Sequence, residues 1–423
     1  MREMKDSGIE WIGEIPADWN LKKLKHTFTI SSGTTPKSDN LEYWDGDIPW
    51  VTPADYKTED KYVYHGRKFL SEAGLNAANL QLLPVNSIIF SKRAPIGAVA
   101  ITGAKLAINQ GCISCVPVIE CDIRYYYFIL SIYTEEFNLL GSGTTFKEIS
   151  SKDFGNFTVP APSVSVQEKL ADYLDRKCSQ IDAIIARQQE VIEKLKAYKL
   201  SVITEAVTKG LNPDVPMKDS GVEWIGEIPE HWDILKLQAH TRMLTPMRDR
   251  PEKLDGDIPW VRIEDYDGKY ISASKEGLGV STETVKEMNL KIYPVGSILC
   301  TSSCDLGKCA IVTRELVSNQ RFINITPDSN TNSDYLYYLM ISNAERLNHL
   351  STGTIQANLS RKAFEHLMVQ FPPISEQKAI SEYLDRKCEA VELSINKKQE
   401  LIDRLSSYKK SLIYEVVTGK KEV

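Results

Sequence analysis

Cysteines are the residues of this chain whose type and spacing come nearest to a chemical site. Cys112 and Cys115 form its single CxxC pair, a spacing that zinc sites use. The positions 210 residues later, in a second copy of the same sequence pattern, hold Phe322 and Ile325. Because the second copy has apolar residues at these positions, the two cysteines are better explained as buried apolar strand residues than as metal ligands. We therefore predict two buried strand cysteines and no zinc site here.

Five further cysteines have no spacing typical of a metal site. Cys300, Cys304 and Cys309 are irregularly spaced, and the positions 210 residues earlier hold Phe, Ala and Val. Cys178 and Cys388 fall within apolar helical repeats and are predicted to be core residues. Scattered cysteines in a chain of 423 residues are typical of reduced thiols in a cytosolic protein.

Motifs for catalysis are also missing from the sequence. The glycine-rich stretch at residues 141–145 lacks the lysine of a phosphate-binding loop. The sequence has no Asn/Asp-Pro-Pro-aromatic signature of an amino-methyltransferase, and its six histidines form no H-x-x-x-H pair. No Asp or Glu is separated from a nucleophile or a base by a sequence spacing typical of a catalytic site. We therefore interpret the chain as non-catalytic, with no metal site and no bound cofactor.

The chain is an internal duplication of one module of about 210 residues, too long for a solenoid repeat. Three motifs occur twice: MKDSG-x-EWIGEIP-x-x-W, DGDIPWV and YLDRKC. They stand at residues 4–19 and 217–232, at 45–51 and 255–261, and at 173–178 and 383–388. Between the first motif and the last, most positions differ between the copies. Residues that are shared support a common scaffold or partner, whereas residues that differ support a separate task in each copy.

The divergent part of each copy is predicted to be a mixed α/β domain. Residues 86–101 and 296–312 combine apolar and β-branched residues around a glycine, as paired strands do. Residues 123–140 and 333–350 are predicted to be short helices, and their aromatic side chains, at helical spacing, to be core.

A long coiled-coil helix is predicted to close each copy. Residues 165–208 carry about five apolar heptads, and Ser165 and Glu168 have the spacing of a capping box, with Ser375 at the same place in the second copy. Two such helices in tandem copies are expected to pack antiparallel about a pseudo-two-fold axis. The predicted a positions of this spacer are Leu174, Ile181, Gln188, Leu195 and Val202, and then Leu384, Val391, Lys398, Leu405 and Leu412. The predicted d positions are Ile184, Val191 and Tyr198, with Ile185 and Ile192 beside them, and Leu401 and Tyr408.

Two polar residues interrupt this apolar seam at equivalent positions. Gln188 and Lys398 either form a polar layer that fixes the register of the helices or mark a solvated part of the seam. The sequence leaves both interpretations open.

The net charge argues at first against a nucleic-acid partner. The chain has 51 Lys and Arg against 57 Asp and Glu, a net charge of −6. However, residues 1–19 and 217–232 each carry a net charge of −3, so the divergent domains are close to neutral. DNA contact by these domains would depend on local clusters of Lys and Arg. We expect the chain to bind DNA weakly alone and tightly only with partners that neutralise more phosphates.

Targeting and membrane signals are not apparent. No apolar run approaches the roughly 20 residues of a membrane span. The first residues are charged and lack the apolar segment of a secretory signal. We therefore expect no membrane association and a cytoplasmic location.

Several of these motifs, in this order, carry a resemblance to a known family. Residues 160–175 and 372–385 each begin with a proline pair and end in YLD, and SGTTP stands at residues 32–36. Together with GDIPWV and the two opening segments, they resemble the specificity (S) subunit of a type I restriction-modification system. The second copy departs from this pattern, with a shortened turn at residues 244–246 and a different strand end at residues 301–307.

The resemblance implies an α+β fold, with two α/β target recognition domains separated by two long conserved helices that pack as an antiparallel coiled coil. Each recognition domain would read one half of a bipartite, asymmetric site in double-stranded DNA. The helices would set the spacer between the halves and dock two methyltransferase subunits that modify adenine N6. Two restriction/translocase subunits would complete the complex of this prokaryotic system. S-adenosylmethionine, ATP and Mg²⁺ are expected on those partners. The expected boundaries are residues 1–162 and 217–373 for the domains with their opening segments, and 163–216 and 374–423 for the helices.

Candidate DNA contacts are the polar and basic residues near the predicted strand ends. Arg pairs well with guanine, and Gln or Asn with adenine. The candidates in the first domain are Thr34, Thr35, Lys37, Lys92, Arg93, Gln110, Thr144, Thr145 and Lys147. In the second domain they are Arg248, Arg250, Ser302, Ser303, Lys308, Gln320, Arg321, Thr354 and Gln356.

For several of these residues a structural role competes with DNA contact. Each candidate could instead be a solvated turn residue. Asn109-Gln110 and Asn319-Gln320 occur in both copies, so a structural hydrogen bond explains them at least as well as DNA contact. Trp50 and Trp260 lie in identical strands and are predicted to be core.

Two other classes of function compete with this one. The first is a scaffold that binds only proteins, with two adaptor domains on a coiled coil. The second is an enzyme in its own right, such as a fused methyltransferase or nuclease, which the missing motifs disfavour.

Overall fold

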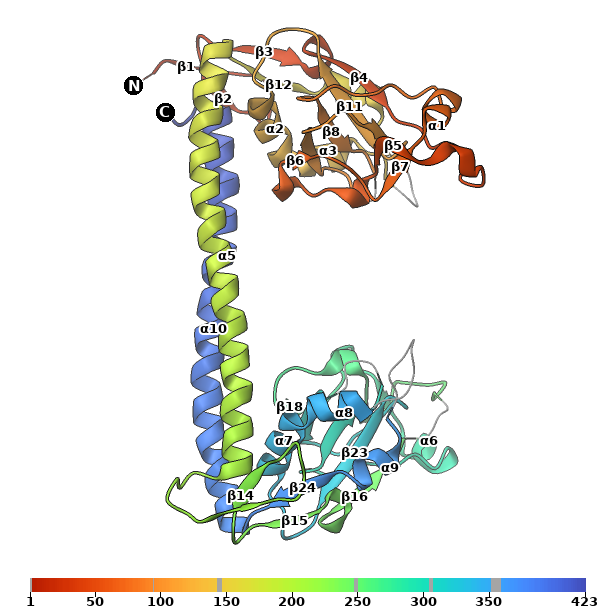
Figure 1. Ribbon diagram of the computed structural model, residues 1–423, viewed down its shortest axis with the longest axis vertical. Helices are drawn as coiled ribbons and strands as arrows, with labels where there is room; N and C mark the ends of the chain where they lie inside the picture. The colour runs from red at the N-terminus through yellow and green to blue at the C-terminus, as the bar shows by residue number, and fades with distance from the viewer. Residues whose placement is uncertain (1, 94, 143–146, 247–249, 304–306, 351–358) are drawn as a thin grey trace. The chain divides into compact units, whose positions relative to one another are not determined.

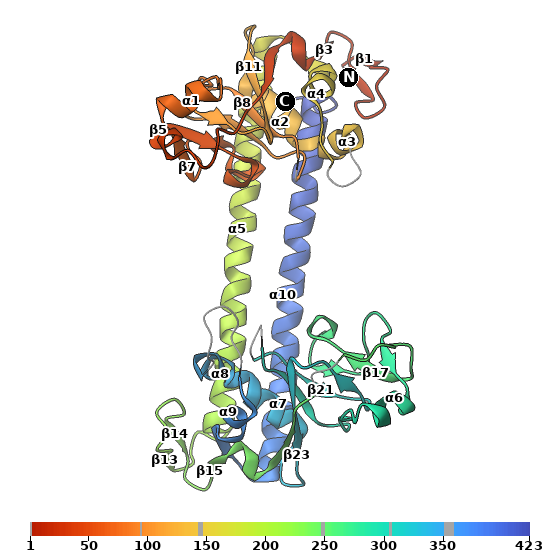
Figure 2. The same ribbon diagram turned by 90° about the vertical axis from the view of Figure 1, so that its right-hand side faces the viewer.

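The computed structural model describes residues 2–93, 95–142, 147–246, 250–303, 307–350 and 359–423 (Figures 1 and 2). It divides into two compact units, residues 1–188 with 400–423, and residues 189–399. Each unit contains one mixed α/β domain and parts of two long helices, α5 (Val164–Lys209) and α10 (Ile374–Val417). The predicted fold class is therefore confirmed.

The first domain is organised around a five-stranded sheet with the strand order β4-β11-β8-β9-β6. All neighbours in it are antiparallel except β6 and β9. Apolar side chains cover both faces of its central strands, which explains why they read as continuous apolar runs. The strands are β4 (Phe28–Ser32), β6 (Tyr62–Val63), β8 (Ile88–Ser91), β9 (Val99–Thr102) and β11 (Cys112–Pro117).

Smaller elements surround this sheet. A three-stranded sheet has the order β10-β5-β7, and two-stranded sheets join β1 to β2 and β3 to β12. Their strands are β1 (Met4–Asp6), β2 (Glu14–Pro16), β3 (Asn20–Lys23), β5 (Trp44–Val51), β7 (Lys68–Leu70), β10 (Ala107–Ile108) and β12 (Thr158–Ala161). The helices are α1 (Glu72–Ala77), α2 (Ile123–Ile132), α3 (Thr134–Leu140) and α4 (Ser151–Asn156), with 3₁₀ turns at Leu24–His26, Leu41–Tyr43, Pro53–Asp55 and Thr58–Asp60.

The second domain repeats this architecture. Its five-stranded sheet has the order β16-β23-β20-β21-β18, and its three-stranded sheet the order β19-β17-β22. The strands are β13 (Met217–Asp219), β14 (Glu227–Pro229), β15 (Asp233–Lys236), β16 (Thr241–Leu244), β17 (Ile258–Val261), β18 (Tyr270–Ile271), β19 (Gly279–Val280), β20 (Ile298–Thr301), β21 (Cys309–Val312), β22 (Val317–Ser318), β23 (Phe322–Pro327) and β24 (Met368–Phe371). The helices are α6 (Thr282–Glu287), α7 (Ser333–Ser342), α8 (Ala344–Leu350) and α9 (Arg361–Glu365), with 3₁₀ turns at Leu237–Ala239 and Ile263–Asp265.

The predicted core residues are buried in each domain. The tyrosines of α2, Tyr125 and Tyr126, are at most 1% exposed, and Trp50 and Trp260 are 6% and 5% exposed. Cys112 lies within β11, where burial raises the pKa of its thiol to about 12. These aromatic and cysteine side chains are packing residues, as predicted.

The starts of the two long helices differ from the prediction. α5 begins at Val164, so Ser165 lies inside the first turn and is not its N-cap. The carbonyl of Ser163 instead accepts the first helical amide bonds, from Val166 and Gln167. In α10 the carbonyl of Pro373 does the same, so the predicted capping boxes are wrong. Pro162 and Pro372 directly follow strands β12 and β24, and each helix begins two residues later, one residue before Ser165 or Ser375.

A glutamine in the first turn of each long helix anchors it to its domain. The side chain of Gln167 donates to the carbonyl of Pro162 at 2.8 Å and accepts from the amide of Asp122 at 3.0 Å. Gln377 makes the same two contacts in the second unit, at 2.8 Å each. Both glutamines are at most 4% exposed. The amide group therefore satisfies buried backbone groups where helix and domain meet.

Antiparallel packing of α5 and α10 is visible inside each unit. In the first unit, Leu174 and Cys178 of α5 share a core with Leu412 and Val416 near the end of α10. In the second unit the roles reverse, and Ile203 and Ala206 near the end of α5 share a core with Ile380, Leu384 and Cys388 near the start of α10.

The predicted d positions of the seam are wrong in four cases. Ile184, Tyr198, Leu401 and Tyr408 are 41–53% exposed. The neighbouring Ile192 and Ile402 are buried, as is Cys178, so the buried stripe runs four residues after each a position rather than three. A shift of one residue turns a helical side chain by about 100° and moves it out of the interface.

The predicted a positions lie on the inner side of the helices. Leu174, Ile181, Leu384 and Leu412 are buried. The other six are half-buried: Gln188, Leu195, Val202, Val391, Lys398 and Leu405. Half-burial of Gln188 and Lys398 does not distinguish the two interpretations given above, a polar layer and a solvated part of the seam.

A half-buried lysine joins each domain to the YLDRKC segment of a long helix. In the second unit, Lys269 Nζ lies 2.5 Å from Asp385 and 2.7 Å from Asp334, and 4.9 Å from the ring centre of Tyr338. In the first unit Lys61 forms an ion pair with Asp175 in the same way. Although burial opposes it, the two carboxylates raise the pKa of Lys269. Its stabilisation is therefore present below the unfolded pKa of about 10.4 and is lost as the pH rises through the folded pKa.

Replacing Lys269 with methionine is expected to lower the free energy of unfolding of the second unit by about 1–3 kcal/mol, because two partly buried carboxylates lose their cation. Urea unfolding of the full chain, followed by circular dichroism, measures this change. Lys410→Met is the control, because Lys410 and its partner Glu135 are 57% and 81% exposed, and it is expected to cost less than about 0.5 kcal/mol. Equal losses in both variants would contradict a structural role for Lys269.

Candidate nucleic-acid interface

Strand register brings three loops of the first domain to one end of its sheet. Ser32 at the end of β4 pairs with Ile113, and Ser91 at the end of β8 pairs with Cys112. Both partners lie at the start of β11, so the segments that follow β4 and β8 meet the turn that precedes β11. A fourth segment, residues 147–151, joins them through the bridge between Glu148 and Arg93. We call residues 31–37, 91–93, 109–111 and 147–151 the first polar edge.

Backbone hydrogen bonds hold these loops against one another. The amide of Gly33 donates to Cys112 at 3.3 Å, and the amide of Lys92 donates to Gly111 at 2.9 Å. Ile149 in turn donates to the carbonyl of Lys92 at 3.1 Å. A Cβ at Gly33 would lie 2.0 Å from the carbonyl oxygen of Ile108, so only glycine permits this close approach. The edge is therefore a built surface and not a set of independent loops.

Side chains of the predicted candidates meet on this edge. The hydroxyl of Thr35 donates to the side-chain oxygen of Gln110. The indole of Trp50 donates to the carbonyl of Thr34 at 3.3 Å, which supports the turn from the core side. Lys37 is exposed. The fold thus unites candidates that lie up to 76 residues apart in the sequence.

Glu148 organises the positive charge of the first polar edge. Its carboxylate lies 2.8 Å from Lys92 Nζ and 3.8 Å from an Arg93 guanidinium nitrogen. Lys92 is only 12% exposed, whereas Arg93 is 37% exposed and Lys147 is exposed. The carboxylate holds the two cations in place and leaves Arg93 the more available of them.

The second domain forms an equivalent edge, which we call the second polar edge: residues 244–246, 302–303, 319–321 and 359–360. Thr301 at the end of β20 pairs with Phe322 at the start of β23. The amide of Ser302 donates to the carbonyl of Arg321, and the amide of Leu359 donates to Ser302, each at 2.8 Å. The backbone framework is therefore the same as in the first domain.

The asparagines shared by both edges have a structural role. Asn109 accepts from the amide of Gly111 at 2.9 Å, and Asn319 accepts from the amide of Arg321 at 3.1 Å. Each asparagine fixes the turn that presents the next residue, Gln110 or Gln320, to solvent. The prediction of structural hydrogen bonds holds for the asparagines. It also holds for Gln110, whose side-chain oxygen accepts from Thr35, and the side chains of Gln110 and Gln320 are both exposed.

The remaining candidates of the second domain lie in different environments. Arg321 and Lys308 are exposed, and Lys308 pairs with Thr301 beside the edge. Arg250 is exposed, with its guanidinium carbon 5.7 Å from the ring centre of Trp260. Ser303 is half-buried and Ser302 is 8% exposed. Thr144, Thr145, Arg248, Thr354 and Gln356 lie outside the described residues.

Sequence reasoning missed several residues that organise the polar edges or join a domain to a long helix. Glu148 has no counterpart in the second copy, so the internal comparison gave no signal for it. Lys61 and Lys269 did leave a signal, because a tyrosine follows the lysine in each copy. However, the two lysines lie 208 residues apart, whereas the other shared positions lie 210 residues apart. The pair of hydroxyls on Ser32 and Ser151, 2.8 Å apart, joins residues that no local pattern connects.

Neither a metal site nor a membrane-spanning helix is found in the part of the chain that the structure describes. No group of three or more His, Cys, Asp or Glu side chains there could hold a metal ion. Among the same residues, no helix is long and apolar enough to span a membrane.

Comparison with known proteins gives consistent matches over the whole chain. The family model of the type I restriction modification DNA specificity domain matches residues 16–194 and again residues 233–402. The specificity subunit of the type I restriction enzyme MjaIX from Methanocaldococcus jannaschii is 31% identical over 307 residues, which cover 69% of this chain and 68% of that protein. The StySPI specificity subunit of Salmonella potsdam is 21% identical and covers 96% of this chain and 90% of its own length.

Solved structures show the same fold. A chain from a structure of type I restriction-modification complex assembly superposes with a TM-score of 0.73 at 13% identity, covering 96% of this chain and 99% of its own. The HsdS subunit from Thermoanaerobacter tengcongensis gives a TM-score of 0.50 at 12% identity, covering 96% and 98%. With two matches to the family model, two mixed α/β domains and two long helices, the chain belongs to the type I restriction-modification specificity subunits, the non-catalytic DNA specificity components whose two target recognition domains define a target site.

Proposed function

We propose that the first and second polar edges are the surfaces that read the two halves of a bipartite site in double-stranded DNA. The observation that carries this proposal is the combination of a shared backbone framework with different side chains. Lys92 and Arg93 on the first edge correspond to Ser302 and Ser303 on the second. Two different half-sites require two different readers on one scaffold.

The side chains of the edges suit the two kinds of contact that DNA recognition needs. Arg93 and Arg321 can each donate two hydrogen bonds to guanine, and Gln110 and Gln320 can pair with adenine. Lys37, Lys147 and Lys308 would contact phosphates, which position the protein without reading sequence. Arg250 would add a further phosphate contact beside the second edge.

Replacing Arg321 with alanine is expected to weaken specific DNA binding by about 1–3 kcal/mol, or about 5- to 150-fold, and to relax selectivity at one base pair of one half-site. Gel-shift titrations of the complex at several salt concentrations measure the affinity and the salt slope. Arg386→Ala, at an exposed position of α10, is the matched control. Unchanged affinity, selectivity and salt slope for Arg321→Ala would exclude the second polar edge as a reader.

We also propose that the long helices dock two methyltransferase subunits. Exposed apolar side chains at equivalent positions support this proposal. Tyr198 on α5 and Tyr408 on α10 are 52% and 53% exposed. In the second unit, a groove of about 700 Å³ runs beside Tyr198 and is also lined by Val202, Leu211 and Tyr383. Equivalent surfaces in two copies suit two copies of one partner.

The other components of the complex would join through these partners. The relative of known structure comes from a study of type I complex assembly. Two restriction/translocase subunits would complete this chain's complex, and S-adenosylmethionine, ATP and Mg²⁺ would bind to the partner subunits. This chain would supply the DNA sequence specificity and would set the distance between the two half-sites.

Changing both Tyr198 and Tyr408 to glutamate is expected to abolish methyltransferase binding, because two charges would have to be buried in the interface. Each single variant is expected to retain one bound partner. Native mass spectrometry of the co-purified complex counts the subunits. Lys196→Glu, an exposed change on the same helix, serves as the control. A double variant that still binds two partners would refute these docking positions.

The length of α5 and α10 is proposed to set the spacer between the half-sites. Inserting one heptad into both helices adds about 10 Å to each, or about three base pairs. Sequencing N6-methyladenine in cells that express the variant with its partner enzyme should reveal the original half-sites with a longer spacer. Insertion into α5 alone breaks the helix pairing and is expected to abolish methylation. An unchanged spacer in the double insertion would disprove this role of the helices.

A further inference from the structure

The β20–β21 hairpin of the second domain places two cysteines directly opposite each other. Cys300 on β20 and Cys309 on β21 are register partners. The next pair, Thr301 and Lys308, is joined by a backbone hydrogen bond of 3.0 Å, so the cysteines occupy a non-hydrogen-bonded position. Cα atoms at such positions lie about 4.5 Å apart, within the range that a disulfide requires.

The two sulfur atoms are already in contact. Their separation is 2.7 Å, and both residues are free thiols. Cys300 is 1% exposed and Cys309 is 5% exposed, so neither side chain can turn away to solvent without disturbing the core. Bond formation would therefore need little movement of the backbone.

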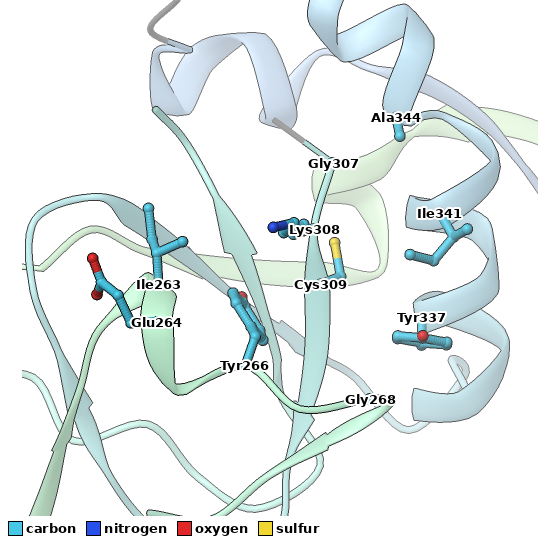
Figure 3. A pocket seen from close by; sticks show the side chains of 10 residues that line it. All are labelled: Ile263, Glu264, Tyr266, Gly268, Gly307, Lys308, Cys309, Tyr337, Ile341 and Ala344. Carbon is cyan, nitrogen blue, oxygen red and sulfur yellow. The ribbon is translucent and has the colours of Figure 1, made fainter. Parts of the chain in front are cut away.

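A cavity of about 820 Å³ gives access to one of these thiols (Figure 3). Cys309 lines it, together with Tyr266, Lys308 and Tyr337. Figure 3 shows the Cys309 side chain among these residues, between the hairpin and the helix that carries Tyr337. Cys300 is absent from the lining, so a small reagent would reach Cys309 first.

The first domain has a longer segment at the equivalent place, and this segment contacts the neighbouring elements. There the Tyr127 hydroxyl donates to the carbonyl of Thr58 at 2.5 Å, and the amide of Val99 donates to the Thr58 hydroxyl at 3.3 Å. Five residues separate Asp55 from Lys61 in that domain, whereas three separate the equivalent Asp265 from Lys269. The segment that borders the cavity beside Cys309 is therefore two residues shorter in the second copy.

We propose that Cys300 and Cys309 are an oxidation site that forms a cross-strand disulfide with a low-molecular-weight disulfide as the oxidant. The Cys309 thiolate attacks one sulfur of the reagent, which forms a mixed disulfide and releases the first small thiol. Cys300 then loses its proton and attacks the Cys309 sulfur, which closes the bond and releases the second small thiol. Two protein thiols are oxidised and one reagent disulfide is reduced.

The order of these steps follows from the environments of the two thiols. Cys309 lines the cavity and Cys300 does not, so the reagent meets Cys309 first; burial also raises the pKa of Cys300 well above its ordinary value, which disfavours its thiolate as the first nucleophile. In the first domain the equivalent strand positions hold Phe90 and Val99, so the bond is confined to the second unit. The proposal does not depend on DNA recognition.

Peptide mapping of the full chain tests the proposal. The Cys304→Ser variant is incubated with excess glutathione disulfide, alkylated under denaturing conditions and digested with trypsin without reduction. Cleavage after Lys291, Lys308 and Arg314 places Cys300 in residues 292–308 and Cys309 in residues 309–314. A linked pair of these peptides, lighter than their summed thiol masses by two hydrogen atoms, is the expected result.

Further variants make the outcome specific. Cys309→Ser should abolish the link and leave Cys300 fully alkylated, and Cys300→Ser should trap glutathione on Cys309. Cys112 and Cys115 are the internal control, because both are buried in the first domain and should stay alkylatable after denaturation. Complete alkylation of Cys300 and Cys309, or a mixed disulfide on Cys309 that persists beside Cys300, would overturn the proposal.

Discussion

Each recognition domain depends on a lysine that is held between aromatic rings and a carboxylate of the adjoining helix. Lys61 pairs with Asp175 and Lys269 pairs with Asp385, and each aspartate belongs to the repeated YLDRKC segment. A charge pair that is partly buried tolerates little displacement, because either partner left alone would be desolvated without compensation. The pair therefore fixes the domain on the adjoining helix, while the residues of the polar edges differ between the two copies.

Internal duplication separates the parts of the molecule that must stay the same from those that must differ. The anchoring glutamines, Gln167 and Gln377, make the same contacts in both units. The two polar edges share backbone hydrogen bonds, yet the residues that project from them differ in charge and in hydrogen-bonding groups. The side chains of the two edges can therefore differ while backbone hydrogen bonds hold the loops in place.

Electrostatics of the chain agrees with this division of tasks. The excess of acidic residues lies in the two repeated opening segments, and the domains that carry the edges are close to neutral. On the first edge, Glu148 compensates part of the charge of Lys92 and Arg93. Non-specific attraction to phosphates grows with the number of uncompensated cations, so this pairing weakens it on the first edge.

Local sequence patterns determined much of this protein. The duplication, the paired strands around β8–β9 and β20–β21, the aromatic core and the extent of both long helices were all predictable, because each rests on the periodicity of neighbouring residues. The capping boxes and four d positions were not. A shift of one residue leaves the apolar composition of a helix unchanged, so composition cannot fix which residues face the partner.

Only the tertiary structure decided which distant residues meet. Pairing of β4 and β8 with β11 brings residues 31–37, 91–93 and 109–111 to one edge, and it depends on contacts far apart in the chain. The same holds for the Glu148 carboxylate and for the contact between Cys300 and Cys309. The sequence by itself determined the family and the elements, since these are properties of local pattern and order. The site emerged from strand register, which is set by packing across the whole domain.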